Sequence, residues 1–399
     1  MEAGYDVVVA GTICLDMTPM FKEMNEKRMQ DIFAPGKLRD MGSMTLSTGG
    51  PVSNTGIGLI KLGAKAIFMG KIGDDYIGRG ILNLLSQYGD AADSMQVVGG
   101  EDSSYTVVIV PPGFDRIFLH CAGANQSFCS KDVDYDVVKQ ARVFHLGYPP
   151  IMKGLYENRG AELIKIFKAV KELGVTTSLD MSVPDANGAS GRVDWEAVLK
   201  ELLPYVDFYL PSAEETMYMI DRAEYDRLEK SAGSADMLEN LDINALSVLG
   251  KRLLSYGAGI VAIKSGVKGF YLTTADAERL GKMGKAKPTD MENWAGRELH
   301  EESFKVPVAS ATGSGDSSIA GFLSAYLRGM GIEDCIKIAC CVGGQNVQVM
   351  DAVSGVKSFE ETLTLMGQWE KNKLSVSGDY FRYLSDRQVY AGKGDKLYG

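Results

Sequence analysis

A glycine-rich segment reads Ala311-Thr312-Gly313-Ser314-Gly315-Asp316, and the apolar run from Ile319 to Leu327 follows it. Two glycines around a serine, then a carboxylate and a helical pattern, predict a loop that opens a helix. Glycines let backbone N–H groups approach an anion closely, and the helix N-terminus adds partial positive charge. An Asp here is placed to take a proton from a hydroxyl beside a bound phosphate. An ordinary capped helix gives the same pattern, so the segment alone does not decide between the two.

The composition is typical of a globular protein that does not bind nucleic acid. The chain has 399 residues, 45% of them hydrophobic and 24% charged, and can bury a large core. Its net charge of −10 argues against nucleic acid as a partner, because such proteins carry a basic surface. The six cysteines and three histidines show no metal-ligand spacing. We expect neither a signal peptide nor a membrane span, and hence a cytoplasmic protein.

Strand-like and helix-like segments alternate along most of the chain. The expected strands include Tyr5–Ala10, Val143–Leu146, Thr176–Asp180, Phe208–Leu210 and Gly259–Ile263. This alternation predicts βαβ units in an α/β fold, with a doubly wound, mostly parallel sheet flanked by helices. Parallel strands end at one edge of a sheet, so polar residues just past the strands should converge on one crevice. These residues are Asp16, Asp180, Glu214, Glu215 and Gly266.

Two segments break the alternation and predict a small β-sheet lid. Residues 104–110 and 116–121 are strand-like and flank a turn-forming segment, which indicates a hairpin. A further strand is expected near Met44. The lid would be inserted from about 12–48 and 98–128. Its open strand edges and apolar face predict a homodimer formed through the lid.

The rest of the chain is assigned to the same domain, which spans residues 1–399. Residues 275–300 are polar and show no clear periodicity, so they are expected to form an insertion. The tail, residues 371–399, contains four tyrosines and Phe381 among its charges. These aromatic side chains favour a tail that docks on the domain.

Several short motifs follow one another along residues 5 to 357. They are Asp16, Gly49-Gly50-x-x-x-Asn54, Gly70 to Gly78, Gly123-Ala124-Asn125, Ser178-Leu179-Asp180, Pro211 to Glu215, Lys264-Ser265-Gly266-x-x-Gly269, and Thr312 to Asp316 with Ala320-Gly321-Phe322. Each motif alone is short. In this order they resemble the signatures of the ribokinase-like (PfkB) carbohydrate kinases.

The resemblance implies an ATP- and Mg²⁺-dependent kinase that phosphorylates a hydroxyl of a sugar or related polyol. Asp316 would be the general base, and the backbone N–H groups of Gly313, Ser314 and Gly315 would form the anion hole. The substrate would be bound by Asp16, Gly49, Gly50, Asn54 and Asn125. The nucleotide would be bound by Lys264, Gly266, Gly269, Thr312 and Asn346. Glu215 would organise magnesium, through water.

Elementary chemistry favours the same roles. Phosphoryl transfer needs positioning and charge neutralisation more than covalent chemistry, and inward-facing N–H groups supply the charge neutralisation.

Two residues depart from the family's pattern. Ser310 stands where the family usually has an Asp associated with a monovalent cation, which makes potassium activation doubtful. Ser212 stands where the family usually has the Asn of an Asn-x-x-Glu motif.

Two alternatives remain open at the level of the sequence. A nucleoside kinase of the same fold would stack the base on an aromatic side chain, for which the candidates are Phe33, Tyr105, Phe118 and Phe128. A non-catalytic sugar- or nucleotide-binding regulator would keep the fold without turnover. An NAD-binding protein is set aside, because no Gly-x-Gly-x-x-Gly follows the first strand.

Overall fold

A ten-stranded sheet runs through the part of the chain that the computed structural model describes, residues 4–22, 28–114, 116–233, 236–374 and 379–398. Six neighbouring strands are parallel. In spatial order they are β4 (Ala66–Met69), β1 (Tyr5–Gly11), β9 (Ala141–Gly147), β10 (Thr176–Asp180), β11 (Phe208–Tyr209) and β12 (Ile260–Lys264). The remaining strands continue antiparallel as β13 (Phe270–Thr274), β14 (Glu298–Glu301), β16 (Val389–Gly392) and β15 (Phe381–Leu384).

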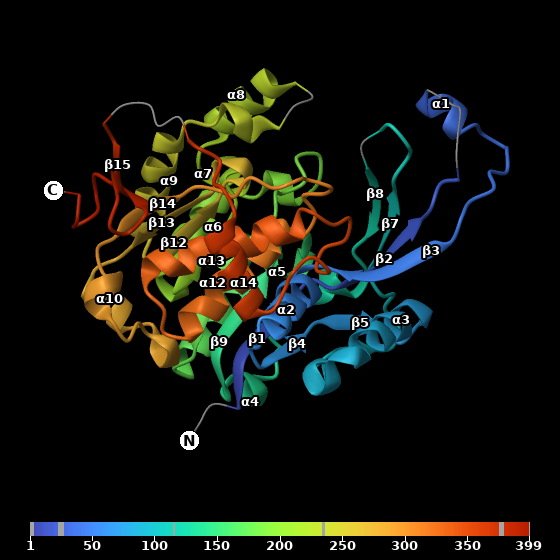
Figure 1. Cartoon of the computed structure of the whole chain (residues 1–399). Coiled ribbons are helices and arrows are strands. Elements are labelled where there is room, and N and C mark those ends of the chain that lie inside the picture. The colour runs from blue at the N-terminus through green and yellow to red at the C-terminus, as the bar shows by residue number, and fades with distance from the viewer. Residues whose placement is uncertain (1–3, 23–27, 115, 234–235, 375–378, 399) are drawn as a thin grey trace.

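Helices cover both faces of this sheet, which confirms the predicted α/β class (Figure 1). One face packs against α2 (Pro51–Lys61), α3 (Tyr76–Leu85), α12 (Ser314–Leu327), α13 (Ile332–Asn346) and α14 (Phe359–Gln368). The other packs against α5 (Lys153–Glu172, with non-helical backbone at 157–160), α6 (Trp195–Leu202), α7 (Ala213–Ile220), α8 (Arg222–Ala232) and α9 (Ile243–Ser255). Val7 and Val9 of β1 belong to the first core, whereas Val8 and Ala10 belong to the second. A strand covered on both faces reads as an unbroken apolar run, as β1 does.

A separate sheet projects from the body as the lid (Figure 1). Its strands lie in the order β3 (Met44–Gly49), β2 (Cys14–Pro19), β7 (Tyr105–Ile109) and β8 (Ile117–Cys121). The β7–β8 hairpin and the strand near Met44 were expected. They are joined by β2, which pairs in parallel with β7 and antiparallel with β3. A two-stranded sheet of β5 (Lys71–Gly73) and β6 (Gln96–Val98) adjoins α3, and the short α1 (Met29–Ile32) lies at the outer end of the lid.

The insertion and the tail complete the main sheet. Residues 275–300 form α10 (Ala277–Gly281), α11 (Met291–Trp294) and most of β14, in place of the irregular segment expected from their polarity. The tail returns as the β15–β16 hairpin, and β16 pairs with β14. The tail therefore docks, as its aromatic residues suggested. The short α4 (Tyr135–Val138) precedes β9. No helix in the described ranges has the length and apolarity needed to cross a membrane.

A buried ion-pair network fastens the insertion to the tail. The Arg297 side chain is fully buried, and it donates to Asp395 Oδ2 from Nε and to Glu333 Oε1 from Nη2 at 2.8 and 2.9 Å. The Asp395 carboxylate also accepts the Glu298 N–H at 2.9 Å. Nothing in the local sequence indicates that these charged residues are buried. They are buried because they neutralise one another.

Asp395→Ala is expected to lower the free energy of unfolding by about 3–5 kcal/mol, because it leaves the buried Arg297 charge short of a partner. Urea unfolding followed by circular dichroism measures the loss. The control is Asp386→Ala, whose side chain is 77% exposed and lies 3.9 Å from Arg387. It should cost no more than about 1 kcal/mol. Equal losses in the two variants would contradict the assignment of the network.

Candidate active site

Asp316 lies in the first turn of α12 with its carboxylate buried. Three side chains donate to it, namely Asn54 Nδ2 at 3.0 Å, Thr55 Oγ1 at 3.2 Å and the Tyr148 hydroxyl at 3.0 Å. Burial raises the pKa of Asp316, and the donors, together with the charge of Lys264, partly oppose this rise. The result is an oriented carboxylate in a site with little water, as a general base requires.

The Gly49-Gly50 pair allows α2 to begin directly against the lid. A Cβ at Gly49 would lie 2.4 Å from Asp16 Oδ2, and a Cβ at Gly50 would lie 2.4 Å from the Thr12 carbonyl oxygen. Gly50 also has a φ of 88°, which other residues rarely adopt. The close approach brings Asp16 near the start of the helix. Asn54 then follows one turn later and reaches Asp316.

Asp16 belongs to a polar row across the lid sheet. Asp16 on β2 is in register with Thr106 on β7, which is in turn opposite His120 on β8. Cys14 Sγ donates to Asp16 Oδ1 at 3.3 Å, and Thr106 Oγ1 lies 3.0 Å from His120 Nδ1. Burial raises the pKa of Asp16. The row offers a set of hydrogen-bonding groups on a single face.

Asn125 supports the base of the lid. Its side chain is almost fully buried, and its amide accepts the Ile13 N–H at 3.2 Å and donates to the Ile13 carbonyl at 2.9 Å. Both polar ends of the side chain are therefore engaged with the backbone that leads into β2. The structure gives Asn125 a bracing contact, where the sequence predicted a contact with substrate.

The glycine loop, residues 311–316, presents backbone donors at the start of α12. Gly313 has a φ of 70°, and a Cβ there would lie 2.3 Å from the Ala352 carbonyl oxygen. The Ser314 N–H donates to the Ala311 carbonyl at 3.2 Å. Within the described residues, the N–H groups of Gly313, Gly315 and Asp316 donate to no protein acceptor. They are therefore available to an anion, with the helix dipole behind them.

Two further carboxylates and a lysine lie beside this loop. Lys264, at the end of β12, donates to Asp180 Oδ1 at 2.5 Å and to the Leu210 carbonyl at 2.6 Å. Glu215, in α7, accepts the Ser212 N–H at 2.6 Å in a capping box. Burial raises the pKa of both Asp180 and Glu215. Burial alone would lower the pKa of Lys264, but the two acids outweigh it and raise that pKa.

A cavity of about 250 Å³ opens beside the loop. Lys264, Gly266 and Gly269 line it, together with Gly315, Gly343, Gly344, Cys340 and Asn372. Thr312 and Asn346, the other two predicted nucleotide-binding residues, do not line this cavity. Asn346 is buried and donates to the Thr312 carbonyl at 2.9 Å, so it braces the glycine loop. A Cβ at Gly343 would lie 2.3 Å from Ser318 Oγ and 3.3 Å from the Ser314 carbonyl oxygen, so α13 packs closely against the first turns of α12 here.

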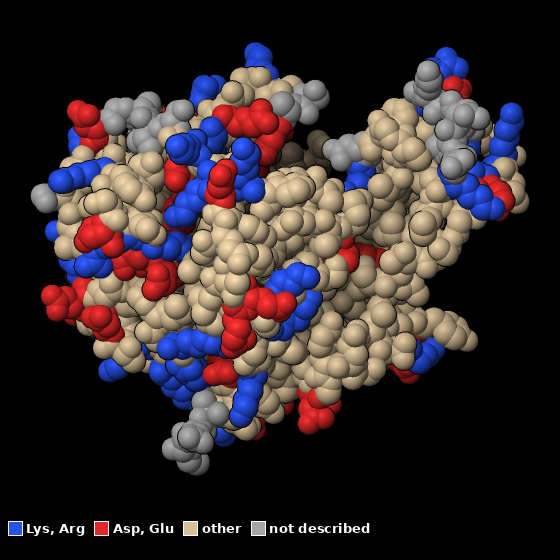
Figure 2. All heavy atoms as spheres, viewed as in Figure 1, with Lys and Arg blue, Asp and Glu red and all other residues tan. Residues whose placement is uncertain are grey.

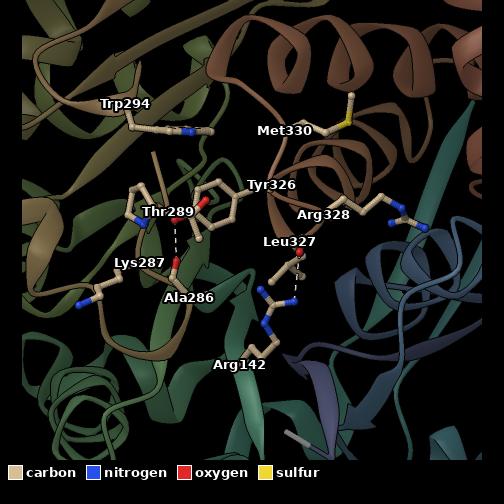
Figure 3. Close-up of a pocket in the computed structure, with 11 residues that line it drawn as sticks. Arg142, Ala286, Lys287, Thr289, Trp294, Tyr326, Leu327, Arg328 and Met330 are labelled. Carbon is tan, nitrogen blue, oxygen red and sulfur yellow. Dashed lines mark hydrogen bonds between the residues drawn. The ribbon is translucent and has the colours of Figure 1, made fainter. Parts of the chain in front are cut away.

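A second cavity, of about 350 Å³, lies at the opposite end of α12 (Figure 3). The 14-residue helix separates the two cavities by roughly 20 Å. The basic residues that line this second cavity do not converge on a common point. Lys287 and Arg328 point away from one another, and Arg142 donates to the Leu327 carbonyl (Figure 3). This hollow is not part of the candidate site.

Sequence reasoning missed three contacts of the site. Tyr148 directly follows β9 and has a left-handed φ of 64°. Polar residues at the carboxyl ends of parallel strands were expected to converge, as Asp180 does at the end of β10, and the same rule would have located Tyr148. Thr55 is adjacent to the predicted Asn54. Arg116 comes from the β7–β8 hairpin and donates to Thr312 Oγ1 at 2.6 Å. No pattern in the sequence marks it.

The doubly wound sheet with its separate β-sheet lid is the fold of the ribokinase-like kinases. The relatives of the chain are named carbohydrate kinases, which supports a phosphotransferase that acts on a sugar hydroxyl. Residues 14–358 match the family described as pfkB family carbohydrate kinase, and the chain belongs to this family. The resemblance noted in the sequence is thereby confirmed.

Known proteins resemble the chain over nearly its whole length. It is 22% identical to 5-dehydro-2-deoxygluconokinase of Lacticaseibacillus casei, covering 94% of this chain and 100% of that protein. It is also 22% identical to fructokinase-2 of Solanum lycopersicum, covering 90% and 95%. The structure of Arabidopsis thaliana ribokinase complexed with ribose and ATP superposes with a TM-score of 0.65 at 19% identity, covering 92% of this chain and 99% of that one.

Tyr148→Phe is expected to move the acid limb of the pH profile of kcat/KM to higher pH. The Tyr148 hydroxyl donates to Asp316 and so lowers its pKa. Loss of this hydrogen bond should raise the pKa of Asp316 further. Tyr256→Phe, which removes a hydroxyl bonded to Glu196 on another face, is the matched control and should leave the profile unchanged. An unshifted acid limb in Tyr148→Phe would contradict the role of Asp316.

Proposed function

We propose that this kinase transfers the γ-phosphate of ATP to a hydroxyl of a sugar or sugar-like polyol, with Asp316 as general base. The observation that carries the proposal is the buried Asp316 carboxylate, which three side chains orient at the N-terminus of α12. The N–H donors of the glycine loop lie in the same turn. The general base and the anion-binding N–H groups thus belong to one continuous segment, residues 313–316.

In the proposed step, Asp316 takes the proton of the sugar hydroxyl. The freed electron pair on oxygen forms a bond to the γ-phosphorus. The bond from that phosphorus to the bridging oxygen breaks, and its electron pair leaves with ADP. The glycine loop stabilises charge on the transferring group, as a loose transition state requires. Asn54, Thr55 and Tyr148 hold the base in one orientation throughout.

Magnesium would be held by Asp180 and Glu215 together with phosphate oxygens and water. In the described ranges, no three His, Cys, Asp or Glu side chains are grouped so as to hold a metal ion. Two carboxylates with phosphate oxygens and water suit Mg²⁺, which usually keeps several waters and binds through one or two carboxylates and substrate phosphates. The ion would neutralise phosphate charge. The positive charge of Lys264 offsets the repulsion between these two buried carboxylates.

The lid face favours a polyol as substrate. Asp16, Thr106 and His120 lie in one row and supply acceptors and donors for adjacent hydroxyls. Among the four aromatic candidates for stacking a nucleoside base, Phe128 is buried in the core on one face of the main sheet, and Tyr105 packs against the core on the other face. Phe118 shares the face of Thr106 and His120 and is 55% exposed. It is the observation that keeps a nucleoside kinase as the second candidate.

Asp316→Asn is expected to lower kcat by about 10²–10⁴-fold, because the amide cannot accept the proton. ADP release is measured with D-ribose, D-fructose, 5-dehydro-2-deoxy-D-gluconate and adenosine as acceptors. Asp226→Asn, on the exposed face of α8, is the matched control and should keep full activity. Turnover with adenosine alone would favour the nucleoside kinase, and binding without turnover would favour the non-catalytic regulator.

We also propose that the chain forms a homodimer through the lid. One face of the lid exposes Met44, Leu46 and Leu119, each about half exposed, and within the described residues neither edge strand pairs with a further strand. Figure 2 shows that much of the lid surface facing the viewer carries no charge, in contrast to the charge-rich surface of the body. Exposed apolar faces and open edges of this kind are ordinarily covered by a partner.

Leu46→Glu combined with Leu119→Glu is expected to convert the dimer into a monomer, because each change buries a charge in the apolar contact. Sedimentation velocity measures the change. Val248→Glu, which alters an equally apolar residue on α9 that is 68% exposed, is the control and should leave the mass unchanged. A wild-type protein that sediments as a monomer at all concentrations would refute the dimer.

A further inference from the structure

The tail of the chain supplies one wall of the cavity beside the glycine loop. Asn372 lines this cavity, and it lies beyond residues 14–358, the part of the chain that matches the family. The neighbouring Lys371 forms an ion pair with the buried Glu301 carboxylate. The Asn372 N–H donates to the Ser303 carbonyl at 2.8 Å. The backbone that carries Asn372 is therefore fastened to the wall.

The side-chain amide of Asn372 can take only one orientation. Its Nδ2 donates to Ser303 Oγ at 2.9 Å and to the Phe304 carbonyl at 3.2 Å. The Phe304 carbonyl can only accept a hydrogen bond, and the Ser303 hydroxyl gives its own proton to the Val267 carbonyl at 2.5 Å. Both neighbours therefore require an amino group, so the amide cannot turn over.

The carbonyl end of the same amide remains open. Both hydrogens of Asn372 Nδ2 are engaged, whereas Oδ1 accepts no hydrogen bond from the described residues. An amide oxygen can accept hydrogen bonds but cannot donate one. Asn372 thus gives the cavity a fixed acceptor, which suits a ligand that presents a donor.

The cavity is lined by both the anion-binding turn and this amide. Ser314 and Gly315 belong to the first turn of α12 and lie among its lining residues. Apolar side chains make up much of the remaining lining, namely Val267, Phe304, Val308 and Val347. A planar ring binds well between apolar walls, and a single well-placed polar group then fixes its orientation. A nucleotide whose phosphates lie on the turn would bring its base into this cavity.

We propose that Asn372 is a specificity-determining residue that reads the base of the phosphate donor. The inference rests on the proposed function. The exocyclic amino group of adenine donates to Asn372 Oδ1. Guanine and hypoxanthine carry a carbonyl oxygen at the same ring position, and this oxygen can only accept. Two acceptors that face one another both stay unpaired, so a 6-oxopurine nucleotide is disfavoured.

Inosine triphosphate (ITP) is the sharpest probe, because it differs from ATP chiefly by an oxygen in place of the amino group. We compare kcat/KM for ATP and ITP, at a saturating concentration of the accepted sugar, in the wild type, Asn372→Leu and Asn372→Ala. Asn83→Leu, at an exposed position on α3, is the control. Calorimetric affinities for Mg²⁺ with ADP and for Mg²⁺ with IDP give a second readout, which needs no turnover.

The wild type should prefer ATP to ITP, and ADP to IDP, by about 10–10²-fold, the loss typical of a polar group left unpaired in a binding site. In both Asn372 variants the two preferences should fall to parity, mainly through weaker use of the adenine nucleotides. Asn83→Leu should keep them. A merely structural defect in the docked tail would weaken both nucleotides by the same factor and leave their ratio unchanged.

Two results would overturn the inference while the kinase activity stands. In the first, the wild type uses ATP and ITP equally well. In the second, an active Asn372 variant keeps the wild-type ratio. If the wild type phosphorylates none of the acceptors but shows a preference for ADP that Asn372→Ala abolishes, the proposed function fails and this inference stands. If the wild type binds neither ADP nor IDP, both fail.

Discussion

The hydrogen bonds to the Asp316 carboxylate join the two halves of the chain. An ionised carboxylate is costly to bury unless donors surround it. Here the donors come from α2 and from the backbone after β9, whereas the carboxylate belongs to α12. The helices α2 and α12 must therefore pack closely, and small residues at their contact permit this. A Cβ at Gly58 would lie 2.8 Å from the Cβ of Ala320.

The same constraint determines where the lid begins. Since α2 has to present Asn54 to Asp316, its first residue abuts the start of β2, and glycines at 49 and 50 are needed for that approach. Asn125 then secures the Ile13 backbone from the other side. The base of the lid is thus fixed to the body, and the lid strands project from it (Figure 1).

Much of the main sheet could be predicted from the sequence, because β1, β9 and β12 are largely apolar runs between helical patterns. The convergence of Asp180 and Glu215 followed from the rule that parallel strands end at one edge. The insertion could not be predicted, because β14 carries Glu298 and Glu301 at buried positions whose partners lie far away in the chain. Arg116 was missed for a similar reason, because its contacts are purely tertiary and leave no local pattern. Tyr148 could have been found, because it directly follows β9 at the same edge of the sheet.

Asn372 is one of the residues that line the cavity beside the glycine loop, and it donates to Ser303 Oγ at 2.9 Å from beyond α14. The ring of Trp369 packs against Phe304 in the same region. Asn372 thus completes a cavity whose other lining residues lie at 236–347, so this wall of the cavity depends on contact between segments that are far apart in the sequence.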